Sequence, residues 1–155
     1  MILKEVQIKK ARRYAFLLLK FRQRSEKEII QRLRQKKFPR EIIKATLFYL
    51  KEKRLIDDIS FARSLIELGL RKHLSIQRIR QGLQLKGLPE KVVEGELARV
   101  KADYSSSSAI QELAKERLEK INEKDPLKVK RQLYAYLLRR GFAAEEVQEV
   151  IEEIL

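Results

Sequence analysis

The chain has no cysteine and only one histidine among its 155 residues. Without cysteine there is no disulfide framework and no thiolate metal site, a composition typical of an intracellular protein. One histidine also excludes a zinc site built from the usual histidine and cysteine ligands. His73 lies near the predicted end of a helix, where we expect a surface or helix-capping role for its side chain.

Glycines are few, and none lies in a phosphate-binding pattern. The five glycines match neither GxxxxGK[ST] nor GxGxxG, so no phosphate-binding loop is expected. Asp57 and Asp58 could suggest a magnesium site, but adjacent carboxylates before a predicted helix are more often helix caps. We therefore predict that the protein is not an enzyme and has no metal and no cofactor.

Long apolar runs are also missing near the start of the chain. The run from Ala15 to Leu19 is too short for the apolar region of a signal peptide and far too short to span a bilayer. The expectation is a cytoplasmic protein without a membrane partner.

What the sequence does contain is an internal repeat. Residues 25–47 align without a gap to residues 75–97, and a third copy follows at an offset of 54 residues from the second. The matches include Ser25 with Ser75, Leu33 with Leu83, Pro39 with Pro89, Gly87 with Gly141, and Leu88 with Phe142. Self-similarity at this period indicates an array of small units that offers one long surface to a partner, which favours binding over catalysis.

Each repeat has the apolar spacing of helices. Apolar residues recur at intervals of three and four, and no alternation typical of strands is present. We predict an all-α protein with nine helices in three tandem three-helix repeats, helix-turn-helix-like, forming an elongated curved array. The predicted boundaries are 1–55, 56–101 and 109–155 for the repeats, with a serine-rich linker at 102–108.

Local signals mark the second helix of each repeat. Ser25 and Glu28 have the spacing of a capping box. Gly87 and Gly141 stand where this helix must stop, a position that favours a left-handed backbone and therefore glycine. Lys37 occupies the matching position in the first repeat. It should either adopt a positive φ, at a cost of about 1 kcal/mol, or stand in a different turn.

Apolar and aromatic residues of the first helices are assigned mainly to the core. The predicted inner faces contain Ala11, Ala15 and Leu18 in the first repeat and, fifty residues on, Phe61, Leu65 and Leu68. The aromatic residues of the first repeat are Tyr14, Phe16, Phe21, Phe38, Phe48 and Tyr49. Most lie at core spacing, whereas Tyr14 aligns with Ser64 and is expected to be exposed. Interleaved with basic residues, such rings could alternatively stack on nucleobases.

Positive charge is concentrated at one end of the sequence. Residues 1–55 hold 18 Lys and Arg against 5 Asp and Glu, whereas residues 56–100 hold 8 against 6 and residues 101–155 hold 10 against 11. This gradient favours a polyanion or an acidic protein surface as partner, bound mainly by the first repeat. The alternative is that the basic side chains only solvate the helices.

We predict a basic track along equivalent helices of the three repeats. In the first helix, Lys9, Arg13, Lys20 and Arg24 fall near one face at i, i+4, i+11 and i+15. The predicted nucleic-acid or filament-binding residues are Lys9, Arg13, Lys20, Arg24, Lys27, Arg34, Arg71, Lys72, Arg78, Arg80, Lys86, Arg131, Arg139 and Arg140. Each phosphate that they neutralise on a single strand should steepen the slope of log binding constant against log salt concentration by about 0.7.

Three motifs follow one another along the chain: Leu55-Ile56-Asp57-Asp58-x-x-Phe61-Ala62, Ser75-x-x-Arg78-Ile79-Arg80-Gln81-x-Leu83-x-x-Lys86-Gly87-Leu88 and Leu137-Leu138-Arg139-Arg140-Gly141-Phe142. In this order the motifs resemble those of the RecX family of bacterial recombinase regulators. With the repeat layout they cover nearly the whole chain from about Lys10. The departures are Lys37 in place of glycine and a shifted spacing in the third repeat.

The resemblance implies three tandem three-helix repeats that lie in the groove of the RecA–single-stranded DNA filament. Members of the family mostly inhibit the ATPase, strand exchange and filament growth of the recombinase. The implied partners are the RecA filament and DNA, single-stranded or also double-stranded. We expect the protein itself to be a monomer. Two alternatives remain: a stand-alone helix-turn-helix transcriptional regulator that reads the major groove, and a purely structural helical adaptor.

Overall fold

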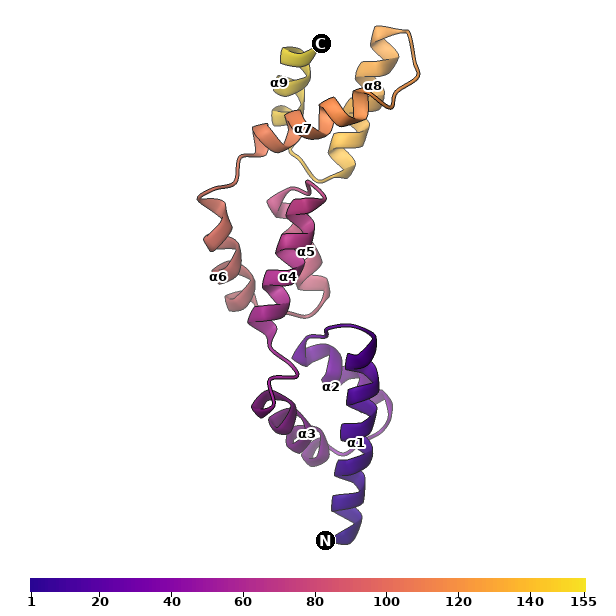
Figure 1. Ribbon diagram of the computed structural model, residues 1–155, viewed down its shortest axis with the longest axis vertical. Helices are drawn as coiled ribbons and strands as arrows, with labels where there is room; N and C mark the ends of the chain where they lie inside the picture. Colours follow the sequence, from indigo (N-terminus) through magenta and orange to yellow (C-terminus); the bar gives the residue numbers. More distant parts are fainter. The chain divides into compact units, whose positions relative to one another are not determined.

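The computed structural model describes residues 1–155 as nine α-helices joined by short turns, with no strand (Figure 1). The helices are α1 (Ile2–Phe21), α2 (Glu26–Gln35), α3 (Arg40–Glu52), α4 (Asp58–Arg71), α5 (Ile76–Leu85), α6 (Glu90–Lys101), α7 (Ser106–Leu118), α8 (Pro126–Arg139) and α9 (Ala144–Ile154). The prediction of an all-α helical repeat protein is confirmed. None of the nine helices combines the length and the apolar character needed to cross a membrane.

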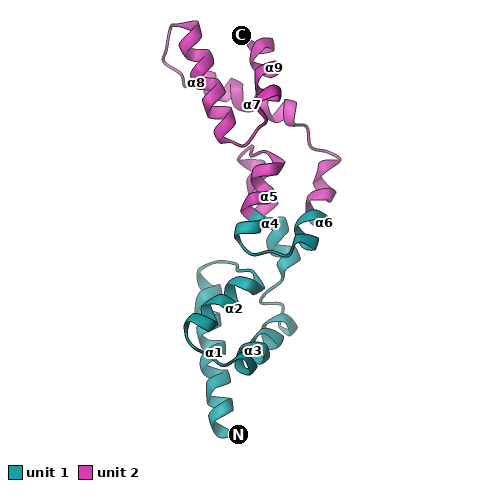
Figure 2. Cartoon of the chain, turned by 180° about the vertical axis from the view of Figure 1, so that it is seen from behind, with its two compact units in different colours: residues 1–64, 83–96 teal, residues 65–82, 97–155 magenta.

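The chain divides into two compact units, which Figure 2 distinguishes by colour. Unit 1 consists of Met1–Ser64 and Leu83–Glu96, and unit 2 of Leu65–Gly82 and Leu97–Leu155. The boundaries fall inside α4, α5 and α6, so the middle repeat contributes part of each of its helices to each unit.

The core of unit 1 lies between α1, α2 and α3. The predicted inner face of α1 is confirmed, since Ala11 and Ala15 are fully buried and Leu18 nearly so. The buried residues of this core are Ala11, Ala15, Leu18, Ile29, Leu33, Ile42, Ile43, Leu47, Leu50 and Ile56. Two small alanines on α1 let the helix approach its neighbours closely, and the branched residues of α2 and α3 fill the space that remains.

The core of unit 2 is formed by α7, α8 and α9. Its buried residues are Ile110, Leu113, Ala114, Leu133, Leu137, Phe142, Val147, Val150 and Ile151. The side chain of Asp125 caps α8 by accepting a hydrogen bond from the Leu127 amide, and Pro126 follows in the first turn, where its missing N–H is not needed.

The middle helix α4 corrects one prediction. Phe61 is buried, but Leu65 is only half-buried and Leu68 is exposed. The inner face runs instead through Ala62 and Ile66, which lie one turn apart. The fifty-residue repeat therefore predicted the position of α4 in the sequence correctly. It did not predict which side of α4 faces the core, because the apolar residues of α4 do not fall at the same positions as those of α1.

The serine-rich linker is also shorter than predicted. Ser105 is the N-cap of α7, and its hydroxyl accepts a hydrogen bond of 3.2 Å from the Ser108 amide. Ser106 to Ser108 therefore form the first turn of a helix. Serine favours this position because its hydroxyl can satisfy a free amide of the first turn.

Candidate nucleic-acid interface

Three of the predicted cations on α1 are free and exposed. Lys9, Arg13 and Lys20 all lie on the side of the helix that faces away from the core, and none of them forms an ion pair. Their spacing of four and seven residues places them along one face, as predicted. The three charges are thus available to a partner.

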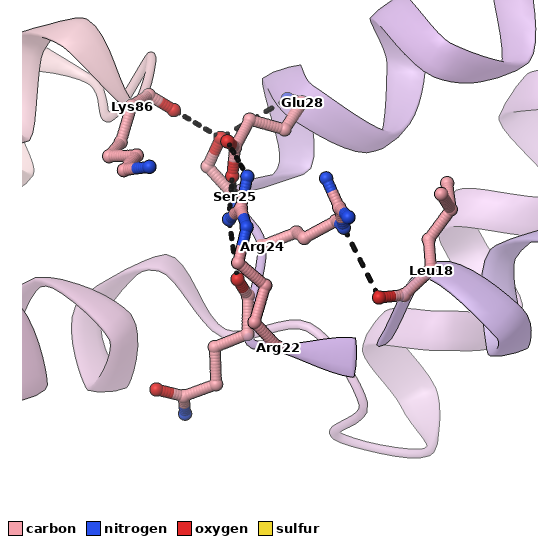
Figure 3. A network of polar contacts seen from close by, with 7 residues as sticks. Leu18, Arg22, Arg24, Ser25, Glu28 and Lys86 are labelled. Atoms are coloured by element: carbon pink, nitrogen blue, oxygen red, sulfur yellow. Dashed lines mark hydrogen bonds and ion pairs between the residues drawn. The ribbon is translucent and has the colours of Figure 1, made fainter. Parts of the chain in front are cut away.

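Arg24 does not extend that face. The helix ends at Phe21, and the following Arg22 is extended, so the chain turns before Arg24. Its side chain folds back and donates a hydrogen bond of 3.2 Å from Nε to the carbonyl oxygen of Leu18 (Figure 3). Burial, together with the nearby positive charge of Arg22, lowers the pKa of Arg24. Arg24 therefore satisfies a carbonyl at the end of α1, and its prediction as a face residue was wrong.

A network around Ser25 fixes the start of α2. The hydroxyl of Ser25 accepts from the Glu28 amide at 3.1 Å, and the Ser25 amide donates to the Glu28 carboxylate at 3.0 Å. This capping box confirms the prediction. The same hydroxyl donates to the carbonyl oxygen of Lys86 at 2.5 Å, and Arg22 pairs with Glu28 at 2.7 Å (Figure 3). A single serine thus joins the start of α2 to the turn that follows α5.

The remaining predicted cations of unit 1 differ in their surroundings. Arg34 and Lys27 are exposed, whereas Lys86 is half-buried. The aliphatic stem of Lys27 packs against Gly87, where an added Cβ would come within 2.8 Å of its Cδ. The contact with Gly87 restricts the stem of Lys27, while its amine remains available to a partner.

The turn after α2 has the left-handed residue that the repeat predicts. Lys37 has a φ of 62°, matching the positive φ of Gly87 and Gly141. The amides of Lys37 and Phe38 donate to the carbonyls of Arg34 and Leu33, the two hydrogen bonds of a Schellman motif. Sequence reasoning did not find two further residues of this kind, Arg54 and His73, which end α3 and α4 with a φ of 53° each.

In unit 2, five of the predicted cations are exposed. They are Arg71, Lys72, Arg78, Arg131 and Arg139. The other two are half-buried and have partners within the unit. Arg80 donates from Nη1 to the side chain of Gln77 at 2.7 Å.

Arg140 joins the end of α8 to the turn between α4 and α5. It donates from Nη1 to the carbonyl oxygen of Lys72 at 3.0 Å and from Nη2 to the hydroxyl of Tyr136 at 3.2 Å. The carbonyl of Arg140 accepts from the Ser75 amide at 3.3 Å. The stem of Arg78 lies against the neighbouring Gly141, so the Lys72 backbone, the stem of Arg78 and the Arg140 side chain meet at one turn.

The aromatic residues of the first repeat are more exposed than predicted. Phe21 is 83% exposed, Phe48 66% and Phe16 40%. Tyr14, expected at the surface, is half-buried against the core, and the Lys36 amine lies over its ring. Helical spacing alone placed Phe16, Phe21 and Phe48 in the core, but α1 and α3 carry apolar residues on more than one side, and only one side of each helix faces the core.

Comparison with known proteins decides the family. The family model described as RecX, first three-helix domain, matches residues 11–50, and the model described as RecX, third three-helix domain, matches residues 106–151. The chain belongs to the RecX family. It is 35% identical over 147 residues to the regulatory protein RecX of Chlorobium phaeobacteroides, covering 94% of both chains.

Further RecX proteins show the same likeness. The chain is 32% identical over 148 residues to the regulatory protein RecX of Clostridium acetobutylicum, covering 94% of this chain and 68% of the relative. The crystal structure of RecX from Lactobacillus salivarius shares its fold with a TM-score of 0.76 at 20% identity, over 96% of this chain and 97% of that one. A second crystal structure, of a regulatory protein RecX, has a TM-score of 0.72 at 21% identity and covers 97% of this chain and 74% of that one. The family is one of regulatory proteins.

Proposed function

We propose that the protein regulates homologous recombination and DNA repair by binding the RecA–single-stranded DNA filament in the cytoplasm. It would inhibit the ATPase, the strand exchange and the growth of that filament. The observation that carries the proposal is the set of exposed cations without an ion pair on α1, in a member of a regulatory-protein family. Such cations suit a partner that contains phosphates and acidic side chains.

Inhibition of this kind needs no catalytic group. A protein that binds one state of the filament more tightly than another shifts the balance between the states by that difference in affinity. The repeats supply several separate contact surfaces, and contacts made to more than one RecA protomer or nucleotide at a time would reinforce one another.

The direct test is ATP hydrolysis by RecA on single-stranded DNA, titrated with this protein. We expect hydrolysis to fall as the protein is added and to be strongly reduced once it is stoichiometric with RecA. Unchanged hydrolysis at that amount would remove the proposed function. A stand-alone helix-turn-helix regulator would instead keep its affinity for one duplex sequence at high salt, which gel-shift measurements would reveal.

A charge-matched pair of variants separates binding from net charge. Arg13→Glu with Lys20→Glu reverses two free cations of α1, and we expect at least tenfold more protein to be needed for the same inhibition. Lys115→Glu with Lys120→Glu reverses two exposed cations of unit 2 with the same change in net charge. Equal effects of the two double variants would mean that only total charge matters, and a purely structural adaptor predicts no effect of either.

A further inference from the structure

The outward side of α1 carries apolar side chains that unit 1 leaves partly or largely exposed. Phe16, Leu17 and Phe21 are 40%, 52% and 83% exposed. They alternate with the free cations of the same helix. We call this surface the α1 outer face: Lys9, Arg13, Phe16, Leu17, Lys20 and Phe21.

The spacing of these residues makes the surface continuous. Lys9, Arg13, Leu17 and Phe21 follow one another at intervals of four, and Phe16 and Lys20 lie beside them one turn apart. Neighbours at these spacings touch along a helix. The opposite side of α1 holds the buried residues Ala11, Ala15 and Leu18, so the outer face cannot turn toward the core.

The α1 outer face is positively charged along its length. From residue 6 to residue 25 the sequence has seven Lys and Arg and no Asp or Glu. Glu5, one turn before Lys9, is the single carboxylate on α1. A surface with this charge is complementary to a polyanion, and its exposed rings would in addition favour a partner with flat or apolar groups.

Phe16 is held in a defined orientation. Its ring meets the ring of Tyr49 on α3 edge-on, with centroids 6.2 Å apart and planes at 82°. Arg12 lies over the Tyr49 ring, with its Cζ 3.8 Å from the centroid. Because these contacts fix the ring before a partner arrives, stacking on it would cost little conformational entropy.

We propose that the α1 outer face binds single-stranded nucleic acid directly. Lys9, Arg13 and Lys20 would neutralise phosphates, while unpaired bases would stack on Phe16 and Phe21. This inference deepens the proposed function, and rests on it, by naming the surface that meets the DNA of the filament.

Other polyanions fit this surface less well. A duplex keeps its bases stacked on one another, so it offers the rings nothing to stack on. An acidic membrane favours a helix whose apolar residues form an uninterrupted stripe with the cations at its edges. On α1 the exposed residues Ile2, Val6, Lys9, Arg13, Leu17 and Phe21 follow one another along one side, so two cations interrupt the apolar stripe.

The test uses the whole protein and fluorescein-labelled oligonucleotides read by fluorescence anisotropy. A 20-nucleotide oligo(dT) supplies phosphates and bases, and an abasic oligonucleotide of the same length supplies phosphates alone. We expect Phe21→Ala to weaken oligo(dT) binding about tenfold with an unchanged salt dependence, because stacking is lost while every cation remains. On the abasic strand, Phe21→Ala and the unchanged protein should bind alike.

Phe48→Ala is the matched control, because it removes the same side chain, 66% exposed, from α3, where Glu52 lies one turn further on. It should leave oligo(dT) binding within twofold. The inference is overturned if Phe21→Ala binds oligo(dT) normally, if it loses affinity equally for the abasic strand, or if Phe48→Ala has the same effect. Preference for vesicles rich in phosphatidylserine over oligo(dT) would also overturn it.

Failure of this inference and failure of the proposed function are distinguishable. If the unchanged protein inhibits RecA but Phe21→Ala binds oligo(dT) normally, the regulatory function stands and the α1 outer face is not the DNA contact. If RecA is not inhibited but Phe21→Ala loses oligo(dT) binding selectively, the DNA contact stands and the regulatory function does not.

Discussion

The hydroxyl of Ser25 donates a hydrogen bond to the carbonyl oxygen of Lys86, 61 residues further along the chain, at 2.5 Å (Figure 3). In unit 2 the Ser75 amide donates to the carbonyl oxygen of Arg140 at 3.3 Å. In both units the serine that caps the second helix of one repeat thus meets the turn that ends the second helix of the next. Both serines are buried. The repeated contact is one way in which neighbouring repeats depend on each other for stability.

Ser25→Ala should destabilise unit 1 by about 2–3 kcal/mol, since it removes a helix cap and leaves the carbonyl of the half-buried Lys86 without its donor. Urea unfolding followed by circular dichroism measures the loss. Ser105→Ala is the control, because Ser105 also caps a helix but is exposed and bonds only within its own turn. The control should lose about 1 kcal/mol. Equal losses would show that the contact with Lys86 adds nothing.

Lys37→Gly should stabilise the protein by about 1 kcal/mol. Lys37 is exposed and has a φ of 62°, where a side chain is strained and glycine is not. Lys36→Gly, at a φ of −80°, is the control and should be neutral or destabilising. Both variants lose one positive charge, so a change in charge cannot explain a difference between them. A rise in the urea midpoint for Lys37→Gly and not for Lys36→Gly confirms the strain.

Gly141→Ala should destabilise unit 2 by more than about 2 kcal/mol. Gly141 has a φ of 91°, and an added Cβ would lie 2.6 Å from the Ser75 hydroxyl and 2.7 Å from the Cβ of Arg78. Neither atom can move without shifting the start of α5, so strain and overlap add. Gly82→Ala, within α5 and with nothing within 4 Å, should instead stabilise by about 0.5–1 kcal/mol. A tolerated Gly141→Ala would mean that this turn is loosely packed.

Much of the fold could be predicted from the sequence because its signals are local. The capping box depends only on Ser25 and Glu28, three residues apart, and the left-handed turn at Lys37 follows from its alignment with Gly87. The internal repeat also predicted nine helices and their order along the chain. In each case the residues that decide the structure are neighbours, or stand at equivalent positions of another repeat.

The candidate site was harder to predict because it depends on which side of a helix faces outward. Apolar residues at helical spacing placed Phe21 and Phe48 in the core, yet a helix with two apolar sides can bury only one of them. Arg24 would lie on the same face as Lys9, Arg13 and Lys20 only if α1 continued past Phe21, and the helix ends there. The bond from Arg140 to Lys72 joins residues 68 apart in sequence, which no local pattern reports.

The ion pair of Glu28 should make unit 1 sensitive to acid. Burial alone would raise the pKa of Glu28, but hydrogen bonds from Arg22 and from the Ser25 amide outweigh it, and the pKa is lowered. A carboxylate with a lowered pKa stabilises the fold above its unfolded value of about 4.5 and loses that contribution as the pH falls through the folded value.

Glu28→Gln isolates this effect, because glutamine can still accept the capping-box hydrogen bond from the Ser25 amide but carries no charge. We expect the variant to be less stable at pH 7 by about 1 kcal/mol, a modest value because the Arg22 side chain is 41% exposed and solvent screens the pair. Urea unfolding at pH 7, 5, 4 and 3 measures the difference between the two proteins. That difference should shrink as the pH falls below about 4.5, where the unfolded chain takes up the proton first, and vanish once the pH is below the lowered pKa of the folded carboxylate. A constant difference from pH 7 to pH 3 would show that the charge of Glu28 contributes nothing, and that the variant acts only through the geometry of its cap.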